Sequence, residues 1–410
     1  MICIIADDLT GACDCGVQLV TKGYRARVLV SALSADSLSA ACHAADAVAV
    51  NTSSRELDWP GARARLKALQ PALEAAPGGL IYKKVDSMMR GHVVSELALL
   101  MDMLRLRCCI LAPAYPENHR VFVGGAARDT QNAVEHAPSL KLAGEGPVIK
   151  TIPLSQVRRG SDYLTRMARD AAGEHPCILT MESGSAADLD IIAQAVTRLQ
   201  PGCLPAGSAG LFKRLVPCRP RPDTGPAGAS AAPRPGGTTL IVAGSPHRAT
   251  RAQVRHIAQL KDFAVFELSG AAPQESARDL VRLIRDQQAA LFGNIVLMAA
   301  GSPPAAGGAF SREAAARMEV SLAETAARLS GPLRPAALIL TGGQTAQAVL
   351  DRLGVHVLDL CGQPLEGIAA GLSGSLLVIT KSGGFGQVDT LERLAAYAAS
   401  QHGQAPGTPP

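Results

Sequence analysis

Aromatic and charged residues are scarce in this chain of 410 residues. Phe, Trp and Tyr together make up 3% of it and charged residues 18%, whereas 47% is hydrophobic. A chain this apolar can bury cores, which excludes an intrinsically disordered protein, and those cores must be built from aliphatic side chains. Lysine is scarce too, because it supplies only nine of the 40 basic residues and arginine supplies the other 31. A lysine in a chain that otherwise uses arginine suggests a specific role for that residue.

Other absences narrow the class of protein. No apolar run reaches the roughly 18 residues of a membrane span, and six residues before the acidic pair Asp7-Asp8 are too few for a signal peptide, so we expect a cytoplasmic protein without membrane partners. The net charge of +5 is small and spread along the chain, so nucleic acid is not an expected partner. The ten cysteines lack the spacings of zinc sites and are expected to be buried, reduced thiols. No metal ligands are identified.

A segment rich in proline and glycine divides the chain. Residues 217–237 include six prolines and four glycines, without apolar periodicity, which is typical of a linker. The chain is also too long for one core, since single cores stop growing near roughly 250 to 300 residues. We therefore expect domains at 1–216 and 238–400, followed by a disordered tail at 401–410.

Short apolar runs rich in β-formers alternate with helical patterns in both halves. This alternation predicts an α/β fold in which each domain has a mainly parallel sheet flanked by helices. The first half has predicted strands at 2–6, 27–30, 47–51, 80–83, 109–112 and 177–180, and helices at 11–22, 58–76, 92–105 and 186–200. The second half has predicted strands at 239–243, 263–267, 295–299, 336–340, 355–358 and 376–380, and helices at 247–259, 274–291, 311–329, 344–353 and 389–399.

Polar residues follow three predicted strands of the first half, at the ends where open parallel sheets bind ligands. Their carboxylates, hydroxyls and cations suit a small polyhydroxylated anion. Alternatively, Asp7-Asp8 with Thr10 could merely cap a helix that begins near Gly11, and Lys83-Lys84 could be a solvated strand end. The candidate substrate-binding residues are Asp7, Asp8, Arg55, Lys83, Lys84, Asp86, Ser87 and Arg90.

Glycine-rich turns follow three predicted strands of the second half. Glycine lets the backbone approach a ligand closely, and helix N-termini offer free N–H groups, so three such turns indicate a nucleotide or polyphosphate site. The familiar P-loop, dinucleotide fingerprint, zinc-protease and serine-hydrolase motifs are missing. The candidate nucleotide-binding residues are Ser245, Gly342, Gly343, Gln344, Thr345, Lys381, Ser382, Gly383, Gly384 and Gly386.

Taken together, these motifs resemble those of the four-carbon acid sugar kinase family. The matching segments run in order through nearly the whole chain, which makes the resemblance specific. They are Ile4-Ile5-Ala6-Asp7-Asp8-Leu9-Thr10-Gly11-Ala12, Lys83-Lys84-Val85-Asp86-Ser87-Met88-Met89-Arg90-Gly91, Pro113-Ala114-Tyr115-Pro116, Ala206-Gly207-Ser208-Ala209-Gly210, Thr341-Gly342-Gly343-Gln344-Thr345-Ala346 and Lys381-Ser382-Gly383-Gly384-Phe385-Gly386.

The resemblance implies a sugar-acid-binding N-terminal domain, a nucleotide-binding C-terminal domain and ATP-dependent phosphorylation of a four-carbon acid. Segments 16–19 and 51–55 favour D-threonate or D-erythronate as the substrate, and a 3-oxo-tetronate is the alternative. With the two sites on different domains, we expect an active site in the interdomain cleft and closure about the linker. The family places Asp8, Arg55 and residues 83–87 around the sugar acid, and Ser245, Gly343 and residues 381–384 around the nucleotide.

The expected mechanism is in-line transfer to the C4 hydroxyl from ATP bound as its Mg²⁺ complex. Arg55, Lys84 and Arg90 are expected to hold the substrate carboxylate, and the catalytic residue Asp8 or Asp86 to accept the proton. Three segments depart from the family pattern: residues 87–92 read Ser-Met-Met-Arg-Gly-His rather than Ser-Thr-Leu-Arg-Gly-Asn, Gln344 replaces an acid, and the segment after Pro116 reads Glu117-Asn118-His119-Arg120. If that acid helps to hold Mg²⁺ in relatives, this chain must use water or another residue.

Two other classes of function remain open on the sequence. One is a non-catalytic sensor of a sugar acid and a nucleotide, and the other is a dinucleotide-dependent oxidoreductase, although the fingerprint that the oxidoreductase needs is missing. The stereochemistry of the substrate, the hydroxyl that is phosphorylated and the formation of a homo-oligomer are also left open.

Overall fold

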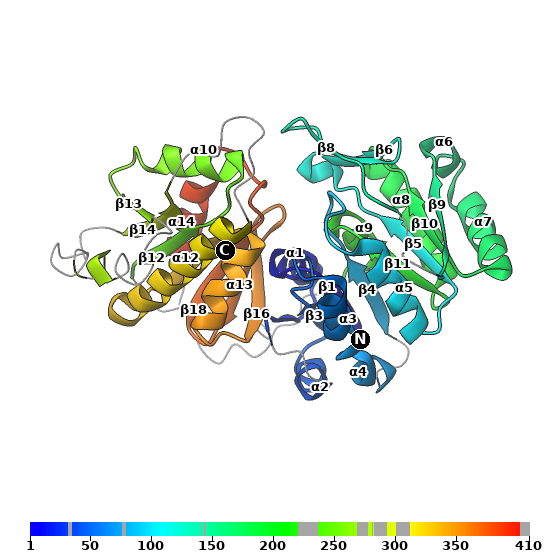
Figure 1. Ribbon diagram of the computed structural model, residues 1–410, viewed down its shortest axis with the longest axis horizontal. Coiled ribbons are helices and arrows are strands. Elements are labelled where there is room, and N and C mark those ends of the chain that lie inside the picture. The colour runs from blue at the N-terminus through cyan, green and yellow to red at the C-terminus, as the bar shows by residue number, and fades with distance from the viewer. Residues whose placement is uncertain are drawn as a thin grey trace. The chain divides into compact units, whose positions relative to one another are not determined.

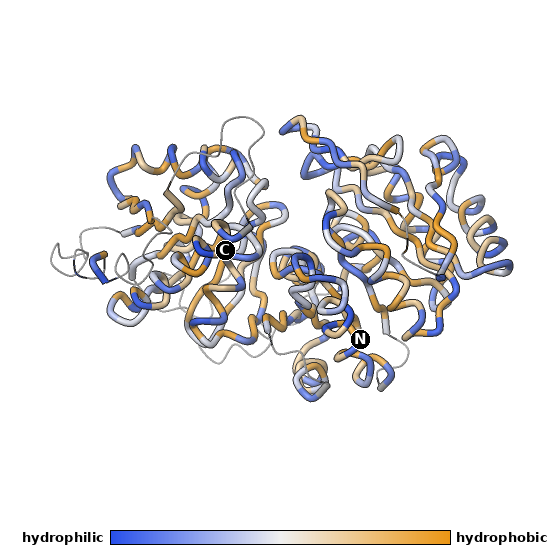
Figure 2. Tube along the Cα trace, in the orientation of Figure 1, coloured by the Kyte–Doolittle hydropathy of each residue, from blue (hydrophilic) through white to orange (hydrophobic). Residues whose placement is uncertain are grey.

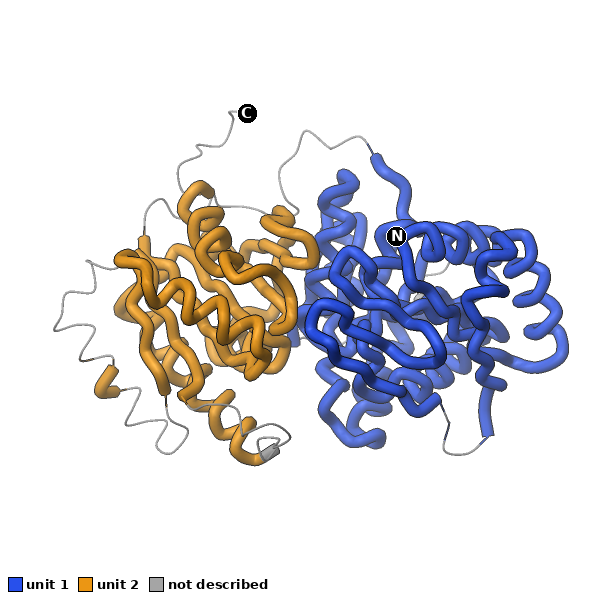
Figure 3. Tube along the Cα trace, turned by 90° about the horizontal axis from the view of Figure 1, so that it is seen from above, with its two compact units in different colours: residues 1–227 blue, residues 228–410 orange. Residues whose placement is uncertain are grey.

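The computed structural model divides into two compact units. Unit 1 is Met1–Ala227 and unit 2 is Gly228–Pro410 (Figure 3). The structure describes residues 1–31, 35–75, 79–140, 142, 145–219, 237–268, 278–280, 282, 293–300 and 312–401. Most of the predicted linker at 217–237 lies outside the described residues, as do residues 402–410 of the predicted tail and most of the predicted helix at 274–291.

Unit 1 is built around a wholly parallel sheet (Figure 1). Its strand order is β2-β3-β1-β4-β11-β5-β10-β9. The strands of unit 1 are β1 (Ile2–Ala6), β2 (Ala26–Leu29), β3 (Ala47–Asn51), β4 (Leu80–Lys84), β5 (Cys108–Ala112), β6 (Arg120–Val123), β7 (Ala126–Asp129), β8 (Val134–His136), β9 (Val148–Ile152), β10 (Cys177–Met181) and β11 (Cys203–Gly207). Its helices are α1 (Leu9–Val20), α2 (Ala35–Ala44), α3 (Trp59–Lys67), α4 (Gln70–Ala75), α5 (Val93–Met103), the 3₁₀ turn η1 (Pro116–Asn118), α6 (Leu154–Val157), α7 (Ser161–Glu174), α8 (Ala186–Leu199) and α9 (Ala209–Leu215).

The central strands of unit 1 are mostly apolar and buried, as expected where helices cover both faces of a sheet. Every residue of β3, β5 and β10 is buried. Figure 2 shows hydrophobic residues concentrated along these strands. Apolar runs without alternation therefore predicted six of the parallel strands correctly, whereas β9 and β11 were missed.

The winding of unit 1 fixes where a ligand can bind. The chain leaves β1 towards β2 and β3 on one side, and it then crosses to β4 on the other side of β1. Ligands of open parallel sheets bind outside the carboxyl ends of the strands at such a reversal. The loops that follow β1 and β4 are the ones that begin with Asp7 and Val85.

A small antiparallel sheet was not predicted from the sequence. Strands β6, β7 and β8 form it directly after β5 and η1. These strands have three or four residues each, which is too short for a periodic pattern to be recognised.

Unit 2 has a mainly parallel sheet with an antiparallel edge. Its strand order is β13-β14-β12-β15-β18-β17-β16, and β17 runs antiparallel to both of its neighbours. The strands are β12 (Thr239–Ala243), β13 (Phe263–Leu268), β14 (Asn294–Ala299), β15 (Ala337–Thr341), β16 (Val357–Leu365), β17 (Ile368–Ser373) and β18 (Leu376–Lys381). The helices are α10 (Arg248–Ile257), α12 (Arg312–Leu333), α13 (Gly343–Arg352) and α14 (Thr390–Gln401).

Unit 2 has a buried core of its own, made of aliphatic side chains from its sheet and from α10 and α14. Ile241, Ile339 and Ile379 lie on adjacent strands at its centre and are fully buried. The prediction of aliphatic cores is confirmed in the described part of the chain.

Three local predictions need correction. The helix predicted at 58–76 is two helices, because Pro71 at the start of α4 lacks the N–H group that would continue α3. Strand β17 was missed, and the strand predicted at 355–358 runs from Val357 to Leu365. The cysteines are free as expected, and seven are buried, but Cys218 is exposed. No helix in the described ranges is long and apolar enough to cross a membrane.

Candidate functional site

Asp8 begins α1 and also faces the neighbouring loop. Its carboxylate accepts hydrogen bonds from the Gly11 backbone N–H at 2.9 Å and from Thr10 Oγ1 at 2.7 Å, which is an N-cap. The interpretation of Asp8 as a helix cap is therefore correct. The same carboxylate accepts a third hydrogen bond, from Arg55 Nη2 at 2.8 Å. Capping consequently does not exclude a role in the site.

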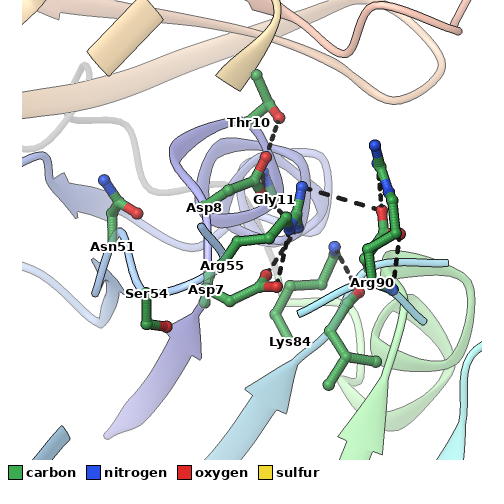
Figure 4. A network of polar contacts seen from close by, with 12 residues as sticks. Asp7, Asp8, Thr10, Gly11, Asn51, Ser54, Arg55, Lys84 and Arg90 are labelled. Atoms are coloured by element: carbon green, nitrogen blue, oxygen red, sulfur yellow. Dashed lines mark hydrogen bonds and ion pairs between the residues drawn. The ribbon is translucent and has the colours of Figure 1, made fainter. Parts of the chain in front are cut away.

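Arg55 holds two carboxylates together (Figure 4). Its Nε and Nη2 donate to the two oxygens of Asp7 at 2.9 and 2.7 Å, in addition to the bond to Asp8. The loop after β3 carries Arg55 to this place, because Ser54 N donates to Asp7 O at 3.0 Å. The side chain of Arg55 is only 9% exposed, and its guanidinium is occupied by the carboxylates of Asp7 and Asp8. This geometry disfavours the predicted contact of Arg55 with the substrate carboxylate.

Asp86 and Arg90 form a second pair in the loop after β4. Arg90 Nε and Nη2 donate to the two oxygens of Asp86 at 2.7 and 2.8 Å, and Arg55 Nη1 lies 3.9 Å from Asp86. Burial acts to raise the pKa of Asp86, but the Arg90 and Arg55 guanidinium groups outweigh it and hold that pKa well below its ordinary value. Asp86 is therefore a stable carboxylate. The Arg90 side chain is 60% exposed and can still contact a ligand.

Lys83 and Lys84 have different surroundings although they are adjacent. Both are buried, so their interpretation as a solvated strand end is wrong. Successive side chains of a strand point to opposite faces of the sheet. Lys83 Nζ pairs with Glu96 at 2.6 Å, whereas Lys84 Nζ donates to Val85 O at 2.8 Å.

The loop after β4 closes tightly over the carboxylates. Gly91 adopts a φ of +85°, and a Cβ there would lie 3.3 Å from Arg55 Cγ and 3.4 Å from Asp7 Oδ2. Glycine is required at this position on both counts. Ser87 is buried in the same loop. Of the predicted substrate residues, the structure brings Asp7, Asp8, Arg55, Lys84, Asp86, Ser87 and Arg90 to one edge of the sheet, and it directs Lys83 to Glu96 instead.

Three loops also converge in unit 2. They follow β12, β15 and β18, which are adjacent in the sheet. A Cβ on Gly244 would lie 2.0 Å from Thr345 Oγ1, and a Cβ on Gly383 would lie 1.9 Å from Ser245 Oγ. The three loops therefore touch at glycines that admit no side chain.

The loop after β15 leads directly into helix α13. Gly342 has a φ of +92° and no side-chain cap bonds the helix N-terminus. The N–H groups of Gly343, Gln344 and Thr345 have no acceptor within the helix, which makes this end a place for an anion. Gln344 is exposed beside it.

Lys381 lies underneath the third loop. It is fully buried, and its Nζ donates to Ser382 O at 3.0 Å, Phe385 O at 3.1 Å and Gly383 O at 3.4 Å. Burial lowers the pKa of Lys381 to about 7. No carboxylate in the described part of unit 2 pairs with it. The geometry therefore makes Lys381 a support for the loop, and its predicted contact with the nucleotide stays a prediction.

Helix α10 fixes the other side of this loop. Thr250 Oγ1 donates to Gly383 O at 2.8 Å, and Gln253 Nε2 donates to Phe385 O and Gln387 O at 3.0 Å each. The loop is thus held by side chains that donate hydrogen bonds to its carbonyl groups. Ser382, Gly384 and Gly386 are half-buried in it.

Comparison with protein families matches both units. A sugar-binding N-terminal domain matches residues 2–215, and a nucleotide-binding C-terminal domain matches residues 240–391. The chain belongs to the four-carbon acid sugar kinase family. Membership of this kinase family agrees with the division between carboxylate-rich loops in unit 1 and glycine-rich loops in unit 2.

Individual relatives cover nearly the whole chain. A D-threonate kinase from Salmonella typhimurium is 29% identical over 425 residues, which cover 95% of this chain and 96% of that protein. A 3-oxo-tetronate kinase from Methylobacterium radiotolerans is 26% identical over 423 residues, which cover 95% of this chain and 97% of that protein. The crystal structure of a Salmonella typhimurium protein has the same fold, with a TM-score of 0.71 at 20% identity over 96% of this chain and 98% of that one.

A protein-held Mg²⁺ ion does not fit the described loops of this kinase. The loops of unit 2 that meet at the glycines offer hydroxyls, carbonyls and Gln344, but no carboxylate. Asp7, Asp8 and Asp86 already accept bonds from arginine. No cluster of His, Cys, Asp or Glu with the geometry of a metal site occurs among the residues that the structure describes.

Sequence reasoning missed Glu96, which completes the environment of Lys83. Its carboxylate pairs with Lys83 and accepts a hydrogen bond from Ser54 Oγ at 2.5 Å. The available signal was a single glutamate on the apolar segment that forms α5, where only a buried cation could balance it.

Proposed function

We propose that this chain is an ATP-dependent kinase that transfers the γ-phosphoryl group of ATP to the C4 hydroxyl of a four-carbon sugar acid. The observation that carries the proposal is the cluster of Asp7, Asp8 and Asp86, organised by Arg55 at the reversal point of a parallel sheet. Carboxylates in this arrangement accept hydrogen bonds from several substrate hydroxyls. The anion-binding helix end and the glycine loops of unit 2 supply the complementary site for a nucleotide.

D-threonate is the proposed substrate, and D-erythronate, which differs at one stereocentre, is the second choice. Identity does not separate the two substrates, because a D-threonate kinase and a 3-oxo-tetronate kinase are each 29% identical to this chain over 425 residues, so the preference rests on segments 16–19 and 51–55. A 3-oxo-tetronate remains the alternative substrate. Two positive groups stay available for a substrate carboxylate: the exposed face of Arg90, and Lys84, whose Nζ donates one hydrogen bond within the described chain.

Asp8 is the proposed proton acceptor. Asp86 is held in a bidentate pair with Arg90. The pKa of the Asp86 carboxyl is well below its ordinary value, which makes this carboxylate a weak base. Proton transfer to a base is a minor part of phosphoryl transfer, so Asp8 acts mainly by orienting the C4 hydroxyl. Asp86 is proposed to orient the substrate through Arg90.

ATP is proposed to arrive as its Mg²⁺ complex, with the metal held by phosphate oxygens and water. The N–H groups that begin α13 and the turn at 382–386 are proposed to bind the phosphates, with Ser245 beside Gly383. Lys381 shapes that turn from below. An active site in a cleft between the two units stays a prediction.

The test is an ADP-release assay with MgATP over D- and L-threonate, D- and L-erythronate and 3-oxo-tetronates, with the product identified by NMR. D-threonate is expected to give the highest kcat/KM and a 4-phosphate. Tight binding of both ligands without ADP release would establish the sensor instead. Activity only on a larger acid would overturn the proposed substrate class.

Variants of Asp8 and Asp86 in the same assay test whether these carboxylates take part in catalysis. Asp8→Asn keeps an N-cap on α1 but removes the charge, so kcat on D-threonate is expected to fall by about 100-fold while the fold survives. Asp58, which caps α3 by accepting from Gly61 N at 3.0 Å, is the matched control, and Asp58→Asn is expected to leave kcat unchanged. Near-normal kcat in both Asp8→Asn and Asp86→Asn would show that neither carboxylate takes part.

A further inference from the structure

Arg120 is the first residue of β6, which follows β5 and η1 in unit 1. The backbone groups of Tyr115 and Arg120 bond each other in both directions, at 2.8 and 3.0 Å, which folds the chain back over the end of the sheet. Because all strands of this sheet are parallel, the carboxyl end of β5 lies on the same edge as the loops that begin with Asp7 and Val85.

The guanidinium of Arg120 is buried and only partly satisfied. The residue is 5% exposed, and its Nη1 pairs with Asp129, its register partner on β7. Asp129 also accepts two hydrogen bonds from Asn132, at 2.9 and 2.6 Å. Arg120 Nε and Nη1 have no hydrogen-bond partner among the described residues, although Nη1 lies in an ion pair with Asp129. A buried donor without an acceptor is unfavourable, so it indicates that something else supplies the acceptor.

A second unsatisfied donor lies two residues earlier, at the end of η1. Asn118 Nδ2 is buried and also has no acceptor within the described chain. Two donors without acceptors, one of them cationic, suit a ligand that has only acceptor atoms, such as a carboxylate. A structural arginine would be expected to find its acceptors within the protein.

The charges of Asp86 and Arg90, which belong to the site already described, act on Arg120. Burial lowers the pKa of Arg120, while Asp129 and Asp86 oppose that effect and Arg90 adds to it. Arg120 is therefore within electrostatic range of the Asp86 and Arg90 pair. Arg55 and Arg90 already donate two or more hydrogen bonds each to aspartates, whereas the Nε edge of Arg120 is unused.

We infer that Arg120, assisted by Asn118, binds the carboxylate of the sugar acid and makes the enzyme selective for acids over neutral polyols. This inference rests on the proposed function. Asp129 holds the guanidinium through Nη1, and the substrate carboxylate supplies the acceptor that Nε lacks. Arg90 and Lys84 then complete the positive surroundings of the anion.

The experiment compares D-threonate with its uncharged analogue D-threonamide by calorimetric binding to the full-length protein without nucleotide. Arg120→Gln is expected to weaken D-threonate binding by about 10- to 100-fold, the loss typical of hydrogen bonds to a charged group, and to change D-threonamide binding by less than about threefold. Because Arg120→Gln leaves Asp129 buried without its cation, the double variant with Asp129→Asn is measured as well, and the same loss of selectivity is expected.

Arg128→Gln is the matched control. Arg128 lies on β7 and pairs with the exposed Glu135, so this variant is expected to bind both ligands like the wild type. Equal weakening of D-threonate and D-threonamide in the Arg120 variants would overturn the inference while leaving the proposed function intact. If the wild type neither binds nor phosphorylates D-threonate or another four-carbon acid, the proposed function fails and the inference with it.

Discussion

At the scale of single residues, the scarce lysines proved informative because three of them are buried. Lys83 is neutralised by Glu96, Lys84 lies on the carboxylate side of the sheet, and Lys381 is surrounded by backbone carbonyls. An ammonium is a compact charge that fits among carbonyl oxygens, whereas the planar guanidinium of arginine does not. The sequence could identify these positions as unusual, but only the structure separates their roles.

The lowered pKa of Lys381 predicts how stability depends on pH. The folded pKa of about 7 lies below the ordinary value of 10.5, so between these pH values the unfolded chain binds a proton that the folded chain has released. Stability therefore rises with pH across this window. Between pH 7 and 9, wild type is expected to gain about 2 kcal/mol in free energy of unfolding relative to Lys381→Met, measured by urea denaturation followed by circular dichroism.

The exposed Lys261 supplies the control for this measurement. Its side chain keeps contact with water, so the difference between wild type and Lys261→Met should not change with pH. A difference for Lys381→Met that is equally flat from pH 7 to 9 would contradict the assignment of Lys381 as the titrating group.

At the scale of elements, short loops at strand ends carry the chemistry while the strands and helices fix their positions. In unit 2 the glycines permit the contact between loops, because Gly244 meets Thr345 and Gly383 meets Ser245. The sequence showed three glycine-rich turns, but it could not show that they follow adjacent strands. That adjacency depends on strand order, which no local pattern encodes.

Gly383→Ala is expected to raise the KM for ATP without raising the KM for D-threonate. The added Cβ would lie 1.9 Å from Ser245 Oγ, so the turn at 382–386 must shift. The KM for ATP is expected to rise by about 10- to 100-fold, while the KM for D-threonate stays within about twofold, in steady-state assays of the full-length enzyme. Gly293→Ala, where nothing lies within 4 Å of the added Cβ, should leave both values unchanged. An equal rise in both KM values would argue against a nucleotide role for this turn.

At the scale of the whole molecule, the two units repeat one winding. In each unit the first four strands of the parallel sheet lie in the order second, third, first, fourth, as β2-β3-β1-β4 and β13-β14-β12-β15. The reversal point therefore falls at β1 and β4 in unit 1 and at β12 and β15 in unit 2. Two of the polar loops follow β1 and β4, and two of the glycine loops follow β12 and β15, so the same physical rule locates both candidate sites.

Separate cores predict that each ligand stabilises its own unit. Trp59 is the only tryptophan of the chain and lies in unit 1, so its fluorescence reports unfolding of that unit. D-threonate at 100 times its Kd is expected to stabilise the fluorescence transition by about 2.7 kcal/mol, and MgATP to leave it nearly unchanged. A shift with MgATP as large as that with D-threonate would contradict the assignment of the ligands to separate units.

The sequence by itself determined the α/β class, most strand positions and the loops that hold the candidate residues, because these depend on local patterns of apolar, polar and glycine residues. It also determined the family, through motifs that remain in order along the chain. Only the tertiary structure decided which residues meet. Lys83 faces Glu96, Arg55 is occupied by two aspartates, Lys381 supports a loop from below, and Arg120 retains an unused donor. These outcomes depend on strand order and on which face of the sheet a side chain occupies, and both are fixed by contacts between segments far apart in the sequence.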